Sequence, residues 1–398
     1  MSIRTLDALE AHGRRLGVRV DVNSPIAAGE LADDARLRAH LETLSELTGA
    51  GGQVAVLAHQ GRPGGEEFTD LAAHAERFNE LLEAPVDYAD GTFCATARDA
   101  IEDLGNGEAV VLENTRFYSE ETMDFTPERA AETHLVAKLA PCLDAFVNDA
   151  FAAAHRAQAS MVGFAARLPA YAGRVMEAEL EVLGAVDETD RPRVYVLGGA
   201  KVKDSIYVAR RILEQGLADE VLTAGIVGNL FLSASGTYVG DGTAEVFERK
   251  GVADCIDRAA SLLEEYGDRI RVPTDVAVDA DHRRTVLGAE ELPHAAPALD
   301  VGPETAAAYA ETIENARTVV LNGPAGVAER DAFAAGTRRI YKAATRAPTS
   351  IVGGGDTAAA LRRLGIEGFT HLSTGGGAAL TMLAGDSLPA VEALRDAH

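Results

Sequence analysis

The chain has 398 residues, of which 47% are apolar and only 5% are aromatic. This length exceeds the roughly 300 residues that one hydrophobic core supports, so we expect two domains. The formal net charge of −25 without a basic run argues against nucleic-acid binding, and no long uncharged apolar stretch exists to span a membrane, so we expect a cytoplasmic protein.

The acidic residues are spread along the chain and form no tail, so the charge by itself implies no partner. An acidic surface keeps a protein soluble at the cost of self-repulsion, which concentrated salt screens. We favour adaptation to salt over an acidic surface without consequence. Cys94, Cys142 and Cys255 have neither metal-ligand nor disulfide spacing, so we expect them to be small core residues.

Short β-branched runs alternate with Ala- and Leu-rich segments of helical period, which is the pattern of βαβ units around a mostly parallel sheet. The expected strands are 19–22, 54–58, 109–113, 145–148, 194–197, 220–223, 318–321, 349–352 and 369–373. Most of them run directly into Gly, Asp, Asn or His. Because open α/β sheets bind ligands beyond the carboxyl ends of their strands, these polar residues are candidate site residues.

A domain boundary is expected near the middle of the chain, where residues 171–187 have helical period and Pro192 precedes a new strand. The sequence thus predicts two doubly wound, mostly parallel-sheet α/β domains of Rossmann-like type, joined by an interdomain helix with a cleft between them. The expected boundaries are 1–170 for the first domain, 171–187 for the helix and hinge, and 188–377 for the second domain.

Arginine and histidine recur at the strand ends of the first half. They occur in RVDVN (19–23), HQGRP (59–63), ENTR (113–116) and HR (155–156), and Arg36 lies in the next helical segment after the first strand. Each alone is weak evidence, because a single Arg is commonly a surface charge and a single His a satisfied core residue. Parallel strands bring these ends to one edge, where guanidinium groups repel one another unless an anion lies among them. The pattern predicts a site for a small, multiply charged phosphorylated acid.

Glycine-rich turns follow strands in the second half, at LGGAK (197–201), LNGPAG (321–326), VGGGDT (352–357) and STGGG (373–377). The GGGDT turn opens a helical segment, so its free N–H groups and the positive helix end favour phosphate. Asp356 in that turn repels phosphate unless Mg²⁺ lies between them. Tight strand-to-helix packing is the structural alternative for any single turn. No GxxxxGK[ST] phosphate loop occurs, so the predicted nucleotide site uses another architecture.

These motifs resemble those of the phosphoglycerate kinase family, in the family's order and over residues 17–394. The matching segments are RVDVNSP, AHQGRP, LENTRFY, NDAFAAAHRAQAS, LGGAKVKDS, LNGPAGVAE, VGGGDTAAA and HLSTGGGAA. The resemblance implies an enzyme that reversibly transfers a phosphoryl group between 1,3-bisphosphoglycerate and Mg-ADP, giving 3-phosphoglycerate and Mg-ATP. It also implies a monomer, in-line transfer after hinge closure, and a C-terminal segment, 378–398, that returns to the first domain.

The resemblance assigns site residues as well. It implies that the first domain holds 3-phosphoglycerate through Asp21, Asn23, Arg36, His59, Arg62, Arg116, His155 and Arg156. It implies that the second domain holds the nucleotide through Gly198, Gly199, Lys201, Asn322, Glu329, Gly354, Gly355, Asp356 and Thr357, with Asp356 as the Mg²⁺ ligand. The catalytic residues that it implies are Arg36, Lys201, Gly375 and Gly376, which position and neutralise the transferring group.

Three positions depart from the family pattern. Ser205 stands where many members have lysine, Gln158 where a second histidine is common, and Ala152 where glycine is usual. Lys203 is a candidate to replace the missing charge at Ser205. Two alternative functions remain: a non-catalytic relative that binds nucleotide and acts as an interaction module, and a different small-molecule kinase on the same fold.

Overall fold

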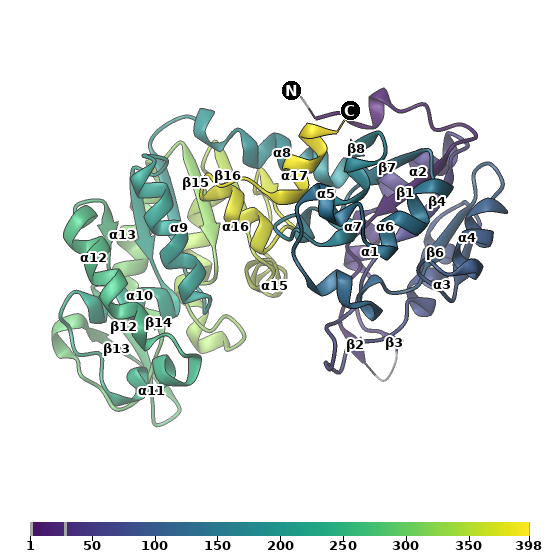
Figure 1. Cartoon of the computed structure of the whole chain (residues 1–398). Helices are drawn as coiled ribbons and strands as arrows, with labels where there is room; N and C mark the ends of the chain where they lie inside the picture. The colour runs from purple at the N-terminus through teal and green to yellow at the C-terminus, as the bar shows by residue number, and fades with distance from the viewer. Residues whose placement is uncertain (1–2, 28–29, 398) are drawn as a thin grey trace. The chain divides into compact units, whose positions relative to one another are not determined.

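The computed structural model describes residues 3–27 and 30–397, without the side chains of Asp187 and Asp356. The chain forms two compact α/β units (Figure 1). Unit 1 comprises Met1–Glu181 and Ser387–His398, and unit 2 comprises Val182–Asp386. The chain passes from one unit to the other within α8 (Arg174–Gly184) and again after Asp386.

In the part of the chain that the structure describes, unit 1 contains a six-stranded parallel sheet with the strand order β5-β6-β4-β1-β7-β8. Its strands are β1 (Arg15–Arg19), β4 (Gln53–Leu57), β5 (Val86–Ala89), β6 (Ala109–Leu112), β7 (Ala145–Asn148) and β8 (Ala170–Ala172), while β2 (Ile26–Ala27) and β3 (Glu30–Leu31) pair separately. Its helices are α1 (Ala35–Ala39), α2 (Leu41–Gly49), α3 (Ala72–Leu81), α4 (Ala95–Glu102), α5 (Pro127–Ala130), α6 (His134–Leu139), α7 (Ala159–Val162) and α17 (Pro389–Asp396).

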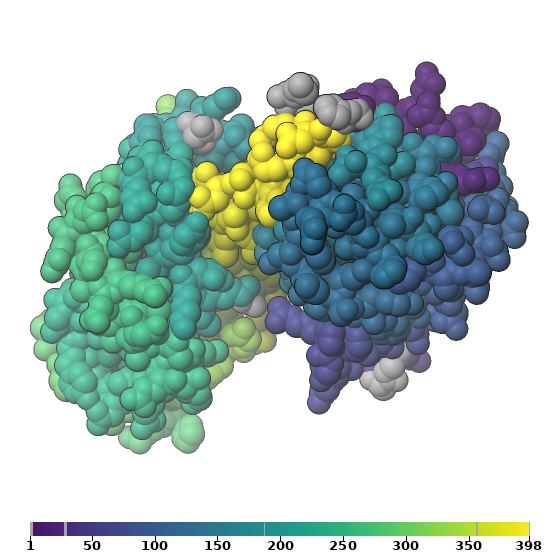
Figure 2. Space-filling model, in the orientation of Figure 1, coloured from purple at the N-terminus to yellow at the C-terminus, as the bar shows by residue number. Residues whose placement is uncertain are grey.

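The central strands of unit 1 are buried on both faces, as expected for a doubly wound sheet. Leu16 and Val18 of β1 pack with Phe78 of α3 in one core cluster. On β7, Phe146 stacks on Phe164 with 5.0 Å between the ring centroids. Helix α17 contacts α7 and β8, so the end of the chain, yellow in Figures 1 and 2, completes the surface of unit 1.

Unit 2, over its described residues, repeats this plan with a six-stranded parallel sheet in the order β11-β10-β9-β15-β16-β17. Its strands are β9 (Arg193–Leu197), β10 (Glu220–Thr223), β11 (Ile270–Arg271), β15 (Thr318–Asn322), β16 (Thr349–Gly353) and β17 (His371–Leu372). Its helices are α9 (Val202–Glu214), α10 (Gly225–Ala234), α11 (Asp241–Lys250), α12 (Ile256–Tyr266), α13 (Pro303–Glu314), α14 (Ala335–Ala344), α15 (Gly355–Leu364) and α16 (Gly377–Leu383). Two units, each built on its own parallel sheet, confirm the predicted fold class.

A three-stranded antiparallel sheet in unit 2 was not predicted. It consists of β12 (Asp275–Ala280), β13 (Arg283–Gly288) and β14 (Ala298–Val301). The two residues between β12 and β13, Asp281 and His282, have φ values of 50° and 60°. These values are typical of the tight turns of hairpins, which Asn-Gly or Asp-Gly normally mark in a sequence. The Asp-His pair and the polar residues of β13 hide the hairpin from sequence patterns.

Two expected elements differ in their bounds. The first strand was expected at 19–22 but is Arg15–Arg19, because the alternation of buried Leu16, Val18, Val20 and Val22 continues beyond the last strand pairing. The helix expected over 171–187 begins only at Arg174, because residues 170–172 form β8 and pair with β7.

The C-terminal segment also begins later than the resemblance implied. Helix α16 contacts α9 and belongs to unit 2, and the residues that group with unit 1 start at Ser387. Cys142 and Cys255 are buried as expected, whereas Cys94 is exposed at the start of α4, so its assignment to the core was wrong. None of the helices within 3–27 and 30–397 has the length and apolarity needed to cross a membrane.

Candidate active site

A pocket of about 560 Å³ lies in unit 1 beyond the carboxyl ends of parallel strands. Its lining residues are Arg62, Pro63, Arg116, Thr122, Arg156 and Gln158. The three arginines follow β4, β6 and β7 respectively, so the sheet brings together groups that are far apart in the sequence. We call this the guanidinium pocket. Gln158, one of the three positions that depart from the resembled family's pattern, also lines this pocket.

Backbone loops beside the guanidinium pocket are tied together through Gly61. The Asn23 side chain accepts a hydrogen bond from the Gly61 N–H at 2.8 Å, and Arg116 donates to the Gly61 carbonyl at 2.7 Å. Gly61 has a φ of +69°, and a Cβ there would lie 2.5 Å from the Glu67 carbonyl oxygen. Glycine is therefore required at this position, and the loops after β1, β4 and β6 hold one another in place.

Asp21 organises the neighbouring cation. Its carboxylate forms an ion pair with Arg36 of α1 and accepts a hydrogen bond from the Asn23 N–H at 3.2 Å. The Asp21 side chain is nearly buried, whereas 43% of the Arg36 side chain is exposed. The pairing holds one end of Arg36 and leaves the rest of the guanidinium open to a ligand.

Arg19 is a buried residue that belongs to the predicted pattern of strand-end cations but was missing from the predicted set of substrate-binding residues. It is fully buried at the end of β1, donates from Nε to Ser160 Oγ at 2.9 Å, and contacts His59 Nδ1 through Nη2 at 2.8 Å. Burial lowers the pKa of Arg19, and the nearby carboxylate of Glu121, which binds Ser160, opposes that effect. The position of Arg19 between the apolar residues Val18 and Val20 was the signal that it is buried and not a surface charge.

His59 is neutral and has a defined tautomer. Arg19 donates to its Nδ1, so the ring proton is on Nε2. Burial holds the pKa of His59 well below its usual value, and the positive charges of Arg19, Arg156 and Arg36 lower it further. His59 thus supplies a neutral N–H donor within a group of cations.

The cations of the guanidinium pocket destabilise one another. Burial lowers the pKa of Arg156, and the Arg62 guanidinium lowers it further, while Asp21 opposes them. Arg156 also donates from Nε to His155 Nε2 at 3.3 Å, which places His155 beside the pocket rather than in its lining. Because one carboxylate is set against several guanidiniums, an anionic ligand relieves this repulsion.

In unit 2, the turns after β9 and β15 pack backbone against backbone. Gly198 N–H donates to the Asn322 carbonyl at 2.7 Å, and Gly199 N–H donates to the Pro324 carbonyl at 2.8 Å. Gly323 has a φ of +84°, and a Cβ there would lie 2.3 Å from the Gly198 carbonyl oxygen. Two of the predicted nucleotide turns therefore pack directly against each other through their glycine backbones.

Side chains from two helices brace the turn after β15. Thr357 of α15 accepts from the Gly323 N–H at 2.8 Å, and Tyr341 of α14 donates to the Gly323 carbonyl at 2.8 Å. Thr337 accepts from Ala325 N–H at 3.0 Å. The predicted residue Thr357 is fully buried and supports the turn through this bond.

Gly354 and Gly355 lie at the amino end of α15, as the sequence predicted, and Gly354 has a φ of +93°. The Asp356 side chain, predicted to hold Mg²⁺, lies outside the described residues. Elsewhere in the described chain, no group of three or more His, Cys, Asp or Glu side chains is arranged to hold a metal. Gly375 and Gly376 lie in the turn between β17, the strand next to β16, and α16, and Gly375 N–H donates to Ser373 Oγ at 3.0 Å.

The position of the missing family lysine is buried. Ser205 is fully buried in α9, and its Oγ has no hydrogen-bond partner among the described residues. Lys203 lies 3.9 Å from Asp254, so the structure gives no sign that it replaces the missing charge. Lys201 is exposed immediately before α9, and Glu329 is exposed after the braced turn.

Asp300 is a buried aspartate that contacts the turn after β15. Asp300 accepts from the Gly336 N–H at 3.0 Å and lies 3.3 Å from Arg284, and a Cβ at Gly326 would lie 2.4 Å from its Oδ1. Burial raises the pKa of Asp300 to about 6, against the opposing effect of the Gly336 N–H and Arg284. The folded protein therefore binds this proton more tightly than the unfolded chain does.

We expect Asp300→Asn to gain stability relative to wild type as the pH rises. Between about pH 4 and pH 6 the unfolded aspartate ionises while the folded one keeps its proton, so the wild type loses stability and the variant does not. The difference in unfolding free energy between the two proteins should change by on the order of 3 kcal/mol from pH 4 to pH 7. Urea titrations at constant KCl measure it, and a pH-independent difference would contradict the role of burial.

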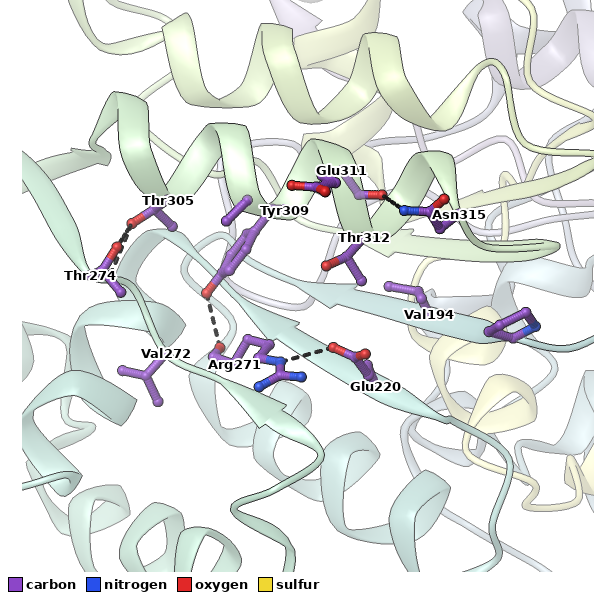
Figure 3. Close-up of a pocket in the computed structure, with 12 residues that line it drawn as sticks. Val194, Glu220, Arg271, Val272, Thr274, Thr305, Tyr309, Glu311, Thr312 and Asn315 are labelled. Atoms are coloured by element: carbon purple, nitrogen blue, oxygen red, sulfur yellow. Dashed lines mark hydrogen bonds and ion pairs between the residues drawn. The ribbon is translucent and has the colours of Figure 1, made fainter.

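A second pocket, of about 490 Å³, lies in unit 2 and is lined by other residues (Figure 3). It is lined by Val194 and Glu220, near the amino ends of β9 and β10, and by Tyr309 and other residues of α13. Within its lining, Arg271 of β11 donates to Glu220 of β10 at 2.9 Å, and the Tyr309 hydroxyl donates to the Arg271 carbonyl at 2.9 Å. None of the predicted site residues lines this pocket.

Two doubly wound units, one with a cationic pocket and one with glycine turns beyond its strands, are features of the class of small-molecule kinases. The family model described as phosphoglycerate kinase matches residues 6–386. The phosphoglycerate kinases of Natronomonas pharaonis and Halobacterium salinarum, both halophilic archaea, are 61% and 58% identical to this chain, over 99% of it and 100% of each relative. The solved phosphoglycerate kinase of Pyrococcus horikoshii OT3 has a TM-score of 0.93 and 40% identity, and the match covers 99% of this chain and 98% of that one. The chain belongs to the phosphoglycerate kinase family.

Family membership defines the reaction. The enzyme transfers a phosphoryl group reversibly between 1,3-bisphosphoglycerate and ADP, which is a step of glycolysis and gluconeogenesis. The predicted function is confirmed at this level, and a non-catalytic interaction module is not favoured. The acidic composition agrees with relatives from halophilic archaea.

Proposed function

We propose that the guanidinium pocket holds 3-phosphoglycerate. Arg62, Arg116 and Arg156 line it, and guanidinium forks bind phosphate and carboxylate oxygens through paired hydrogen bonds. The observation that carries the proposal is that these three arginines, from loops after three different strands, line one pocket, and burial and Arg62 lower the pKa of Arg156 there. A ligand with several negative charges offsets the repulsion between the guanidinium groups of the pocket. Asp21, Asn23, His59 and His155 position these cations or the substrate hydroxyl.

We propose that the glycine surface of unit 2 holds the nucleotide. Glycine turns let a ligand approach the backbone closely, and the N–H groups of Gly354 and Gly355 at the amino end of α15 favour phosphate. Gly198, Gly199 and Asn322 belong to the same surface, with Lys201 toward the phosphates and Glu329 toward the ribose. An aspartate beside nucleotide phosphates offers the oxygen donors that Mg²⁺ prefers, so Asp356 is the proposed protein ligand. When bound, the ion neutralises phosphate charge.

The proposed transfer depends on positioning more than on covalent chemistry, because an acyl phosphate is already a reactive donor. Arg36, held by Asp21 at one side, supplies positive charge from unit 1, and Lys201 supplies it from unit 2. The N–H groups of Gly375 and Gly376 donate to the transferring phosphoryl group. The two substrates then meet through a closure of the units about the ends of α8, which excludes water from the acyl phosphate.

A coupled assay tests the proposal: ATP consumption that depends on 3-phosphoglycerate, measured at low and molar KCl. We expect Arg62→Gln to raise the KM for 3-phosphoglycerate at least about tenfold, because one charged partner of the substrate is lost. The KM for ATP should change less than about twofold. Arg167→Gln, an exposed arginine of unit 1, is the matched control. Equal effects of Arg62→Gln on both substrates, or none on either, would refute the assignment of the pocket.

The proposal extends to a monomer that works in the cytoplasm with metabolites as its only partners. Phosphorylated acids and nucleotides are charged and do not cross membranes unaided, so the enzyme belongs in the compartment that contains them. Sedimentation equilibrium in molar KCl measures the oligomeric state, and a mass near twice that of the 41.8 kDa chain would contradict the monomer.

A further inference from the structure

His40 is a buried histidine that the assigned site does not use. It stands between α1 and α2, only 3% exposed, four residues after Arg36. Its Nδ1 lies 2.6 Å from Asp149 Oδ2, and its Nε2 lies 3.0 Å from the Asp21 backbone nitrogen. One ring thus bridges residues that follow two different strands, β1 and β7.

The hydrogen-bond partners define the state of this ring. Nε2 lies 3.0 Å from the Asp21 N and 3.2 Å from the Asp21 carbonyl oxygen; we assign the shorter contact as the hydrogen bond, so Nε2 accepts from the Asp21 N–H and Nδ1–H donates to Asp149. Helix α1 and the residue that follows it therefore hold Asp21 at two points: Arg36 binds its carboxylate and His40 binds its backbone. The two contacts restrain both the side chain and the backbone of Asp21 beside the guanidinium pocket.

Asp149 connects the same bridge to the start of α8. Its second carboxylate oxygen accepts from Val175 N–H at 2.9 Å and from Met176 N–H at 3.4 Å. These N–H groups belong to the first turn of the helix, where a carboxylate is favoured by the helix dipole. The Asp149 side chain has no exposed surface. Water therefore cannot replace the hydrogen bond that this carboxylate loses when His40 is changed.

We propose that His40 is a positioning residue for the acid substrate, which fixes Asp21 by bridging it to Asp149 and the first turn of α8. The inference rests on the proposed use of the guanidinium pocket for 3-phosphoglycerate. A substrate anion that binds the open side of the Arg36 guanidinium weakens its pairing with Asp21, so Asp21 adjusts when the substrate binds. Because the His40 ring is held from both sides, that adjustment reaches the N–H groups of Val175 and Met176.

Two replacements separate the two contacts of the ring. Glutamine at position 40 places its terminal amide near the site of Nε2 and keeps an acceptor for the Asp21 N–H, while asparagine places its amide near the site of Nδ1 and keeps only the contact with Asp149. We expect His40→Asn to raise the KM for 3-phosphoglycerate about tenfold and His40→Gln to raise it less than about threefold. The KM for ATP should stay within about twofold in both.

The matched control is Thr43→Val. Thr43 Oγ1 accepts from Arg174 N–H at 2.8 Å, so this variant removes a hydrogen bond from the same helix turn without touching Asp21. It should lower the melting temperature as the His40 variants do, yet leave the KM for 3-phosphoglycerate unchanged. If Thr43→Val raises that KM as much as His40→Asn, loss of stability accounts for the effect and the proposal fails.

Hydrogen exchange gives a readout that stability alone does not move. In wild type, saturating 3-phosphoglycerate should slow amide exchange of the peptide that contains Val175 and Met176, and in His40→Asn at saturation it should not. Equal slowing in both proteins would overturn the inference. If 3-phosphoglycerate binding is also insensitive to Arg62→Gln, the proposed function fails instead, so the two failures are distinguishable.

Discussion

Arg36→Ala is expected to lower kcat about a thousandfold while the Kd for ATP stays within about twofold. Arg36 is the half-exposed cation beside the guanidinium pocket, and in the proposed closed enzyme it supplies charge to the transferring phosphoryl group. Removal of a charge that acts mainly in the transition state affects kcat more than substrate binding. The variant also leaves the Asp21 carboxylate unpaired, which repels the acid substrate and raises its KM.

Arg38→Ala is the matched control, because Arg38 lies on the same helix but pairs with Asp34 at 3.0 Å and is half-exposed. It should keep wild-type kcat. Single-turnover kinetics and equilibrium titration with ATP separate the chemical step from nucleotide binding. Near wild-type turnover in Arg36→Ala would show that the role assigned to Arg36 is wrong.

Gly323→Ala is expected to raise the Kd for ATP at least about a hundredfold and to destabilise unit 2. The new Cβ would lie 2.3 Å from the Gly198 carbonyl oxygen, and the backbone φ of +84° is itself unfavourable for alanine. Strain and collision together cost about 2–4 kcal/mol. Relief requires the turns after β9 and β15 to separate, which opens the surface proposed for the nucleotide.

Gly251→Ala separates the two causes. Gly251 ends α11 with a φ of +63°, but a Cβ there meets nothing within 4 Å. This variant should cost only about 1 kcal/mol and leave nucleotide affinity unchanged. Titration with ATP measures the nucleotide affinity of each variant. Titration with 3-phosphoglycerate shows whether unit 1 still binds its substrate. Similar losses in the two variants would mean that the backbone conformation, and not the contact with Gly198, is decisive.

Much of the fold could be predicted because it depends on local patterns. Runs such as 145–148 and 220–223 are short, contain β-branched residues and follow an aspartate, and they coincide with β7 and β10. Patterns fail where the signal is weak or shared. The hairpin of β12 and β13 turns at Asp281 and His282 instead of at glycine, and the buried alternation around β1 continues past the paired residues.

The candidate site was predicted in its chemistry and only partly in its contacts. The sequence by itself determined that cations follow the strands of the first half and glycines those of the second, because a motif is a property of neighbouring residues. Only the tertiary structure decided that Arg19 lies under His59, that Ser205 is buried, that Lys203 lies beside Asp254, and that His40 reaches Asp149, 109 residues away. These facts depend on which strand ends meet and which side of a helix is covered, and packing between distant segments sets both.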